Sequence, residues 1–140
     1  MLYRICFIFF LTVTFANAQS AIIGKWKTID DQTGTERSIV EIYKKGNKVF
    51  GKIIRVLKES DRSKTCIYCS GSDYNKPIEG LEIIKNMEPD GSSYEDGTIT
   101  DPENGKTYRC KLWIDDDNPD ILNVRGYIAF FYRTQQWQKL

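Results

Sequence analysis

The sequence predicts an all-β fold, an antiparallel up-and-down barrel of eight strands. Apolar and polar residues alternate with a period of two, most clearly at 106–114, where Tyr108 and Leu112 share one face and Arg109 and Lys111 share the other. Turns rich in Gly, Asn and Asp separate the alternating segments. No segment shows helical periodicity. Short turns between consecutive strands favour antiparallel neighbours, which close into a small barrel and leave no exposed edge.

Eight segments have the composition of strands, and turn residues separate them. In chain order they are residues 21–30, 38–44, 48–57, 79–86, 94–100, 106–114, 121–128 and 130–138. The Asp-Pro-Glu-Asn-Gly turn at 101–105 joins the fifth and sixth segments into a β-hairpin. In the fourth segment the alternation fits two registers, with either Leu81 and Ile83 or Glu82 and Ile84 facing inwards.

Residues 1–18 are typical of a signal peptide. Arg4 precedes a mostly apolar run at 5–16 that is too short to span a membrane, and Ala16-Asn17-Ala18 has the small-x-small form of a cleavage site. We therefore expect cleavage after Ala18, a single domain at 19–140 without a membrane span, and a periplasmic or secreted location. An uncleaved membrane anchor is the alternative, and the short apolar run argues against it.

The charged residues nearly balance. Lys and Arg number 20 and Asp and Glu number 19, so the net charge is +1, and loss of Arg4 with the signal peptide brings it to zero. Nucleic acid and anionic membranes are not favoured as partners, because both require a basic excess. The chain contains no histidine, which removes the usual general base near neutral pH and the commonest zinc ligand. We expect no metal, no cofactor and no catalytic residue.

Residues 58–77 form the one long segment without a periodic pattern, and such a loop is either functional or needs a tether. Cys66 and Cys69 lie in its middle, whereas Cys110 lies in the strand at 106–114. A redox-active dithiol would require a helix N-terminus in a βαβ unit, and a zinc site would require a fourth ligand. A structural disulfide in an oxidising compartment fits better. Three cysteines allow three pairings, of which we favour Cys66–Cys69 with Cys110 free.

Gly24-Lys25-Trp26 and the segment 133–137 resemble the two ends of lipocalin-type barrels. In those proteins an arginine of the last strand covers the indole of a Gly-x-Trp motif on the first strand and closes one end of the barrel. The resemblance implies that Trp26 is buried against Arg133, with the guanidinium stacked on the indole. The alternative is that Trp26 is simply an aromatic residue of the core.

Six motifs occur in the same order as in an exported bacterial family, the domain of unknown function 2147, which the chain resembles. They are Gly-x-Trp at 24–26, Lys-x-x-Gly-Lys at 48–52, Lys-Pro-x-x-Gly-Leu at 76–81, Asp-Gly-x-Ile-x-Asp-Pro-x-x-Gly-Lys-x-Tyr at 96–108, Arg-Gly-Tyr at 125–127 and Arg-Thr-Gln-x-Trp at 133–137. The element at 101–108 is the most specific. The resemblance implies a lipocalin-like β-barrel and export, and it implies neither an activity nor a catalytic residue.

An eight-stranded barrel can hold one small ligand, so we expect non-enzymatic binding of a small, partly apolar molecule. The candidate ligand-binding residues are the inward aromatic and aliphatic side chains Trp26, Tyr108, Leu112, Val124 and Phe131. The alternative for these side chains is that they fill the barrel as its core.

Two other function classes stay open. An interaction module of the cell envelope would bind protein or glycan through the aromatic residues Tyr68, Tyr74, Trp113 and Tyr127. A carboxylate-dependent hydrolase or isomerase would use residues such as Asp96 and Asp101. These two differ by an odd number of positions, however, and so face opposite sides of a regular strand. The sequence fixes neither the ligand nor the oligomeric state.

Overall fold

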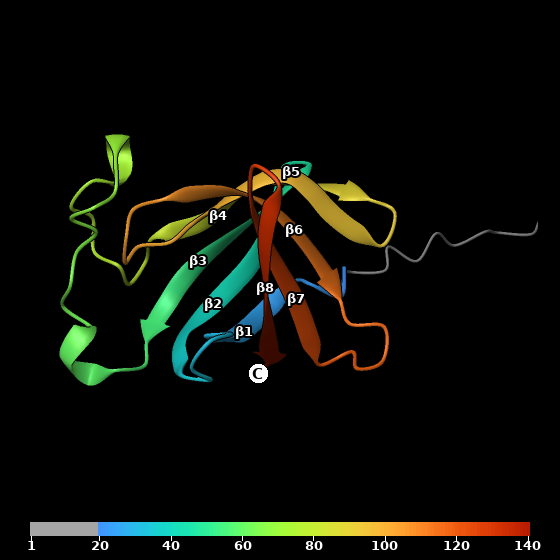
Figure 1. The fold of residues 1–140 in the computed structure, drawn as a ribbon, viewed down its shortest axis with the longest axis horizontal. Helices are drawn as coiled ribbons and strands as arrows, with labels where there is room; N and C mark the ends of the chain where they lie inside the picture. The colour runs from blue at the N-terminus through green and yellow to red at the C-terminus, as the bar shows by residue number, and fades with distance from the viewer. Residues whose placement is uncertain (1–19) are drawn as a thin grey trace, which may run out of the picture.

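The computed structural model describes residues 20–140, which form a closed barrel of eight antiparallel strands in sequence order (Figure 1). The strands are β1 (Gly24–Ile29), β2 (Glu36–Lys45), β3 (Lys48–Val56), β4 (Glu82–Asp90), β5 (Ser93–Thr100), β6 (Thr107–Ile114), β7 (Ile121–Ile128) and β8 (Phe131–Lys139). Two short 3-10 turns, η1 (Glu59–Asp61) and η2 (Gly71–Asp73), lie in the long β3–β4 loop. The predicted all-β, up-and-down architecture is confirmed. The expected signal peptide lies outside the described residues.

Alternation along the strands builds one packed core inside the barrel. In β2, Ser38, Val40 and Ile42 are buried, and the side chains between them are not. In β6, Cys110 and Leu112 are buried in the same way. Burying apolar side chains such as Val40, Ile42 and Leu112 stabilises the fold by about 1.5–3 kcal/mol each, which is the main force holding the strands in register.

The β4 strand departs from simple alternation because it contains extra residues relative to β3, at two shifts in register. Glu82 pairs with Lys52 and Ile84 pairs with Gly51, so Ile83 is the additional residue of a β-bulge. Leu81, Ile83 and Ile84 are all buried as a result. The observed burial therefore combines residues from both registers that the sequence allowed, Leu81 and Ile83 from one and Ile84 from the other.

The two ends of the barrel carry different connections. We call one the long-loop end: it carries the β1–β2 turn, the β3–β4 loop, the β5–β6 turn and the β7–β8 turn, and the long loop lies at the left of Figure 1. We call the other the terminal end, because Ile22 and Leu140 lie there. Ile22 is buried, and the Leu140 N–H donates to the carbonyl of Lys25 at 3.1 Å. The terminal end is therefore covered by the chain itself.

The seam between β1 and β8 is closed only near the terminal end. Two register pairs join these strands, Trp26 with Lys139 and Lys27 with Gln138. By contrast, β7 and β8 pair continuously from Ile128–Phe131 to Ile121–Gln138. The first half of β8 therefore has no backbone partner on its β1 side within residues 20–140, and side chains bridge the seam there.

Candidate functional site

Three of the five predicted ligand-binding residues are fully buried in the barrel. Trp26 and Leu112 are inaccessible to solvent and Val124 is nearly so. The Trp26 indole N–H donates to the carbonyl of Ile22 at 2.9 Å, which satisfies its one polar atom. Tyr108, in phase with Leu112 along β6, is half-buried. The first three side chains therefore fill the barrel, and the inner face becomes accessible to solvent from the level of Tyr108 towards the long-loop end.

Phe131, which the sequence predicts to face inwards, lies at the open edge of the barrel and is not enclosed. The register places Phe131 opposite Ile128, at the first pair of the β7–β8 hairpin. It alternates in phase with the buried Trp137 and so belongs to the inner face of β8, yet its side chain is 80% exposed. The reason is that the hairpin tip extends beyond the end of β1, where no neighbouring strand encloses it.

The predicted stacking of Arg133 on Trp26 is wrong, although the burial of Trp26 is confirmed. Trp26 pairs with Lys139, and Arg133 lies about 20 Å further along β8 at the rise of an extended strand. Arg133 instead binds Asp31 of the β1–β2 turn through both Nε and a terminal nitrogen. The hydrogen bonds from Arg133 lower the pKa of the Asp31 carboxyl below its usual value.

The inner face at the long-loop end carries a group of incompletely buried side chains that we call the rim site. Its members are Ile99, Tyr108, Phe131, Arg133 and Gln135. Gly126 lies beneath this group, because a Cβ there would stand 3.4 Å from the Cβ of Tyr108 and 3.8 Å from Ile99. The rim site therefore combines apolar surface, a phenol, an amide and a guanidinium on one partly exposed face.

A chain of polar contacts connects the rim site to the buried core. The Gln135 amide donates to Asp31 Oδ1 at 3.4 Å and accepts from the Trp137 indole N–H at 3.0 Å. On the other side of the β1–β2 turn, Arg37 forms ion pairs with Asp30 of this turn and with Glu103 of the β5–β6 turn. Backbone N–H groups of Thr33 and Gln32 lower the pKa of Asp30. The β1–β2 turn is thus fixed from both sides, and β8 is bridged to it across the open seam.

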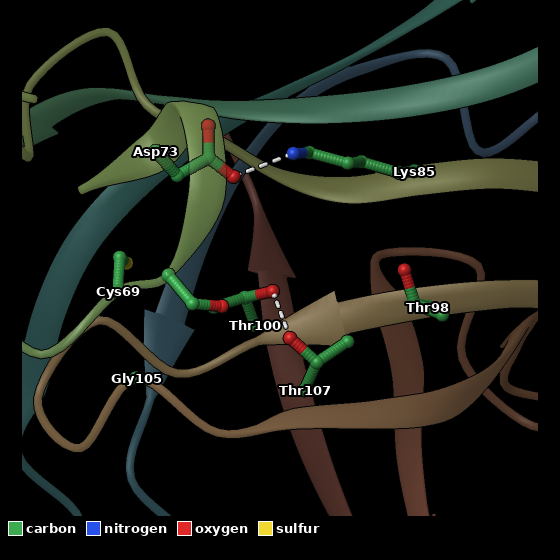
Figure 2. A pocket seen from close by; sticks show the side chains of 8 residues that line it. Cys69, Asp73, Lys85, Thr98, Thr100, Gly105 and Thr107 are labelled. Carbon is green, nitrogen blue, oxygen red and sulfur yellow. Dashed lines mark hydrogen bonds and ion pairs between the residues drawn. The ribbon is translucent and has the colours of Figure 1, made fainter.

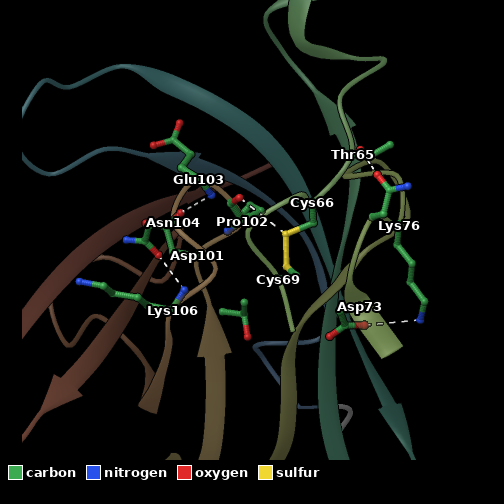
Figure 3. Close-up of a disulfide and its surroundings, with 12 residues drawn as sticks. Thr65, Cys66, Cys69, Asp73, Lys76, Asp101, Pro102, Glu103, Asn104 and Lys106 are labelled. Carbon is green, nitrogen blue, oxygen red and sulfur yellow. Dashed lines mark hydrogen bonds and ion pairs between the residues drawn. A yellow bond between two sulfur atoms is a disulfide. The ribbon is translucent and has the colours of Figure 1, made fainter. Parts of the chain in front are cut away.

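The predicted disulfide between Cys66 and Cys69 is present (Figure 3). Cys110 is a buried free thiol. The Cys66 sulfur lies 3.6 Å from the carbonyl oxygen of Pro102 in the β5–β6 turn. The Cys66 N–H donates to the Lys76 carbonyl at 2.8 Å, so the two arms of the loop pair with each other. Burial raises the pKa of Cys110 to about 12. The loop is therefore ordered and packs over the β5–β6 turn.

A small polar hollow separates this loop from the outer face of β4, β5 and β6 (Figure 2). Its volume is about 120 Å³. Lys85 reaches across it to Asp73 of the loop at 2.6 Å, and the hydroxyls of Thr100 and Thr107 hydrogen-bond at 2.8 Å. The hydrogen bond from Lys85 lowers the pKa of Asp73. Because ligand pockets typically measure about 300–1,000 Å³, this hollow serves to hold the loop and is too small for an organic ligand.

The remaining residues considered from the sequence do not form a single site. Tyr68 and Tyr74 are exposed on the loop, whereas Trp113 and Tyr127 are half-buried on the outer barrel face. Asp101 accepts the N–H of Glu103 at 2.9 Å and so shapes its own turn. Asp96 has a φ of 62° and lies at an irregular point of β5. The two aspartates therefore have separate structural positions.

Two rim contacts were not anticipated from the sequence. Gln135 lies two residues before the buried Trp137, so alternation alone could have placed it on the inner face. Asp31 follows the first predicted strand, and its pairing with Arg133 depends on the stagger of β1 against β8, which the sequence does not reveal. Among the described residues, no group of three or more Cys, Asp or Glu side chains is arranged to hold a metal ion. Helices long and apolar enough to cross a bilayer are absent from 20–140.

Comparisons with known proteins agree with this architecture. A solved structure, protein HP1028 from Helicobacter pylori, described as belonging to the lipocalin family, superposes with a TM-score of 0.72 at 18% identity, covering 85% of this chain and 82% of that chain. At this identity the likeness concerns the fold. No curated protein gave a significant match. The model of a family described as uncharacterized proteins conserved in bacteria (DUF2147) matches residues 24–139. The chain therefore belongs to this bacterial family.

Proposed function

We propose that the protein binds a small, partly apolar ligand at the rim site without transforming it. The observation that carries this proposal is the change in enclosure along the inner face of β8. Trp137 is 2% exposed, Gln135 is half-buried, and Phe131 is 80% exposed. Apolar surface that is left open at the mouth of a barrel is a favourable place for an apolar ligand, because binding removes that surface from water.

Each rim residue has a defined part in this proposal. Ile99 and Phe131 supply apolar contact, and Phe131 covers the ligand from above. Tyr108, Gln135 and Arg133 supply donors and acceptors for a polar group that remains near solvent. Trp26, Leu112 and Val124 form the floor and contact a ligand only at its deepest point. The lipocalin-like fold supports the proposal by analogy, since eight-stranded barrels can hold one small ligand.

We also propose that the protein acts outside the cytoplasm, in the periplasm or in the medium. The disulfide between Cys66 and Cys69 supports this location, because disulfides persist in oxidising compartments. The expected cleavage after Ala18 would release a protein that begins at Gln19. Intact-mass measurement of exported material checks this directly, since retention of residues 1–18 contradicts the cleavage.

The rim proposal is tested with an apolar fluorescent probe, 1-anilinonaphthalene-8-sulfonate, and two neighbouring phenylalanines. Phe131→Ala should weaken probe binding by about tenfold or more, because the loss of a covering aromatic ring removes 1.5 kcal/mol or more of apolar contact. Phe130→Ala is the matched control: Phe130 is 98% exposed at the hairpin turn and out of phase with the inner face. Equal losses in both variants, or no saturable binding to the unmodified protein, would contradict the proposal.

The physiological ligand can be sought in the native material. Organic extraction of protein purified from its own cell envelope, followed by mass spectrometry, should yield a small molecule that is depleted from the Phe131→Ala protein and retained by the Phe130→Ala protein. A compound present in equal amount in both extracts does not occupy the rim site.

A second candidate function rests on the exposed aromatic residues of the long loop. Tyr68 is 64% exposed and Tyr74 is 62% exposed, and both are presented by a segment that the disulfide and Asp73 hold in place. Ordered, exposed tyrosines are typical anchors of protein interfaces. In an envelope interaction module, Tyr68→Ser with Tyr74→Ser would abolish binding of the partner and leave probe binding at the rim unchanged.

A further inference from the structure

The outer face of β6 and β7 carries a compact group of cations and aromatic rings. Alternation directs Arg109, Lys111 and Trp113 of β6 outwards, opposite to the buried Cys110 and Leu112. On β7 the outward side chains include Arg125 and Tyr127, and on β8 they include Tyr132 and Thr134. We call the set Arg109, Lys111, Trp113, Arg125, Tyr127 and Tyr132 the cationic face.

Two of these cations stand directly opposite each other in the sheet. Lys111 and Arg125 are register partners of β6 and β7, and Arg109 lies two residues from Lys111 on the same face. Like charges at directly opposed positions of an antiparallel pair destabilise it. A negative charge between or above the two cations would reduce their repulsion and stabilise this arrangement.

The protein supplies only part of that charge. Lys111 Nζ lies 3.2 Å from Glu95 Oε1 of β5. Within residues 20–140, neither Arg109 nor Arg125 forms an ion pair with a carboxylate, whereas Arg37, Arg55 and Arg133 each do. Arg125 donates from Nε to the Thr134 hydroxyl at 2.8 Å, which leaves its terminal nitrogens for other acceptors.

The aromatic rings fix the guanidinium groups in place. The guanidinium carbon of Arg125 lies 4.2 Å from the centre of the Tyr132 ring and 4.8 Å from that of Trp113, and the guanidinium carbon of Arg109 lies 5.6 Å from the Tyr127 ring centre. Contact with the rings leaves guanidinium N–H donors available to other acceptors, and the forked geometry of these donors matches the two oxygens of a carboxylate or phosphate.

A hollow of about 410 Å³ lies beside these groups. Arg109, Lys111, Thr98 and Tyr127 line it, together with Glu95 and Asp96. The register slips between Tyr94 and Gly97, and Asp96 has a φ of 62°, so an irregularity in β5 shapes this side of the hollow. Its volume falls in the range of about 300–1,000 Å³ that small-molecule sites occupy.

We propose that this hollow is a binding site for an acidic sugar, meaning a ring with several hydroxyl groups and one carboxylate or phosphate. Arg109 lines the hollow and binds the oxyanion, and Arg125, which lies beside the hollow opposite Lys111 on the same face, adds positive charge. Glu95, Asp96 and the Thr98 hydroxyl accept hydrogen bonds from sugar hydroxyls, and the Tyr127 ring contacts the sugar's apolar edge. An anionic membrane or a nucleic acid is disfavoured, because the near-neutral chain lacks the basic excess that an extended anionic surface requires.

This site is separate from the rim site and does not depend on it. The rim residues lie on the inner face of the strands, whereas the cationic face lies on the outside of β6, β7 and β8. The two proposals therefore succeed or fail independently.

Titration calorimetry with four probes tests the acidic-sugar site: glucuronate, glucose 6-phosphate, glucose and inorganic phosphate. Glucuronate and glucose 6-phosphate should bind saturably, and glucose should bind at least about tenfold more weakly, because it lacks the charge-assisted hydrogen bonds to arginine. Inorganic phosphate should also bind more weakly than glucose 6-phosphate. Arg109→Gln should weaken binding of the acidic sugars by about tenfold or more. The matched control is Arg55→Gln on β3, which removes an exposed arginine paired with Glu79 and should leave binding unchanged.

A second measurement on the unmodified protein keeps the test independent of the folding of Arg109→Gln. Trp113 belongs to the cationic face, and the other two tryptophans, Trp26 and Trp137, are buried. Binding of glucuronate should change the tryptophan emission, and Trp113→Phe should remove that change. Absence of saturable binding by either acidic sugar overturns the proposal. So does glucose binding as tightly as glucuronate, inorganic phosphate binding as tightly as glucose 6-phosphate, or an equal loss in the Arg55→Gln control.

Discussion

The terminal end and the long-loop end of this barrel use the same alternation of side chains and close in different ways. At the terminal end, Trp26 and Trp137 fill the interior and Ile22 covers it, and the β1–β8 seam is joined by backbone pairing. At the long-loop end, inner side chains such as Tyr108 and Gln135 are half-buried, and the seam is bridged by the Asp31–Arg133 ion pair. The terminal end thus provides stability, and the long-loop end provides accessible surface.

The physical cause of this difference is the stagger between the first and last strands. Because β1 ends at Ile29, opposite the second half of β8, the hairpin tip at 128–131 extends beyond the part of the barrel that β1 encloses. Side chains there cannot gain the full free energy of burial, so polar residues such as Arg133 and Gln135 are accommodated among aromatic ones at little cost. Strand stagger thus leaves part of the inner face of this small barrel accessible to solvent.

The largest loss of stability is expected from a substitution at the terminal end. Trp26→Ala should destabilise the protein by about 3–5 kcal/mol, because it removes a fully buried aromatic side chain and leaves a cavity. Tyr108→Ala, at the half-buried level of the long-loop end, should cost clearly less. Urea unfolding of both variants measures the two values. A cost for Trp26→Ala of under about 1 kcal/mol, as at an exposed position, would show that the terminal end is not the stabilising one.

The next effect concerns the attachment of the long loop. Gly105 and Gly34 both have a φ of 71°, but a Cβ at Gly105 would stand 1.8 Å from the carbonyl oxygen of Tyr68, and nothing lies within 4 Å of one at Gly34. Gly34→Ala should cost about 1–2 kcal/mol for the left-handed conformation alone. Gly105→Ala should cost about 1–3 kcal/mol more, because the loop must move. Equal melting temperatures for the two variants would contradict tight packing of the loop on the β5–β6 turn.

The disulfide is expected to have an effect of intermediate size. Replacing Cys66 and Cys69 by serine should lower the free energy of unfolding by about 2 kcal/mol, the loop-closure entropy of a very short ring. In denatured, non-reduced protein lacking residues 1–18, thiol titration should find one free thiol. That thiol, Cys110, should not react in the folded protein, since it is buried and its pKa is raised to about 12. A count of three free thiols would show that the loop is not cross-linked.

Much of the fold follows from local patterns, and the parts that do not are non-local. Alternation predicts the eight strands and the inner faces of β2 and β6, because burial on one side of a strand is a local property. It does not reveal the extra residue Ile83 in β4, which depends on the pairing with β3. It assigns Phe131 to the correct face of β8 but cannot show whether neighbouring strands extend far enough to enclose it.

The position of Arg133 has the same explanation. Its distance from Trp26 depends on the stagger of the first strand against the last, which is a property of the closed barrel and is not encoded in either strand alone. The cysteine pairing could be predicted because Cys66 and Cys69 are close in the sequence, so their pairing does not depend on how distant strands are arranged. The cationic face was missed because its members, such as Arg109 and Arg125, come together only through the β6–β7 register.

The smallest effect tests the ion pair that bridges the open seam. Arg133 lowers the pKa of Asp31, so the folded protein binds the Asp31 proton less tightly than the unfolded chain does. The stabilisation from this group is present above the unfolded pKa of about 3.9 and is lost as the pH falls through the lower folded value. Because Arg133 is more than half exposed, solvent screening limits the contribution to at most about 1 kcal/mol. Asp31→Asn should therefore destabilise the protein slightly at pH 7 and not at all at a pH below the folded pKa.

The control is Asp61→Asn, which removes a carboxylate paired with Lys64 within the loop and away from the seam. If salt-bridge closure of the seam shapes the rim site, only Asp31→Asn should change probe binding at the rim. Unchanged probe binding in both variants would show that the rim is held open by strand stagger alone.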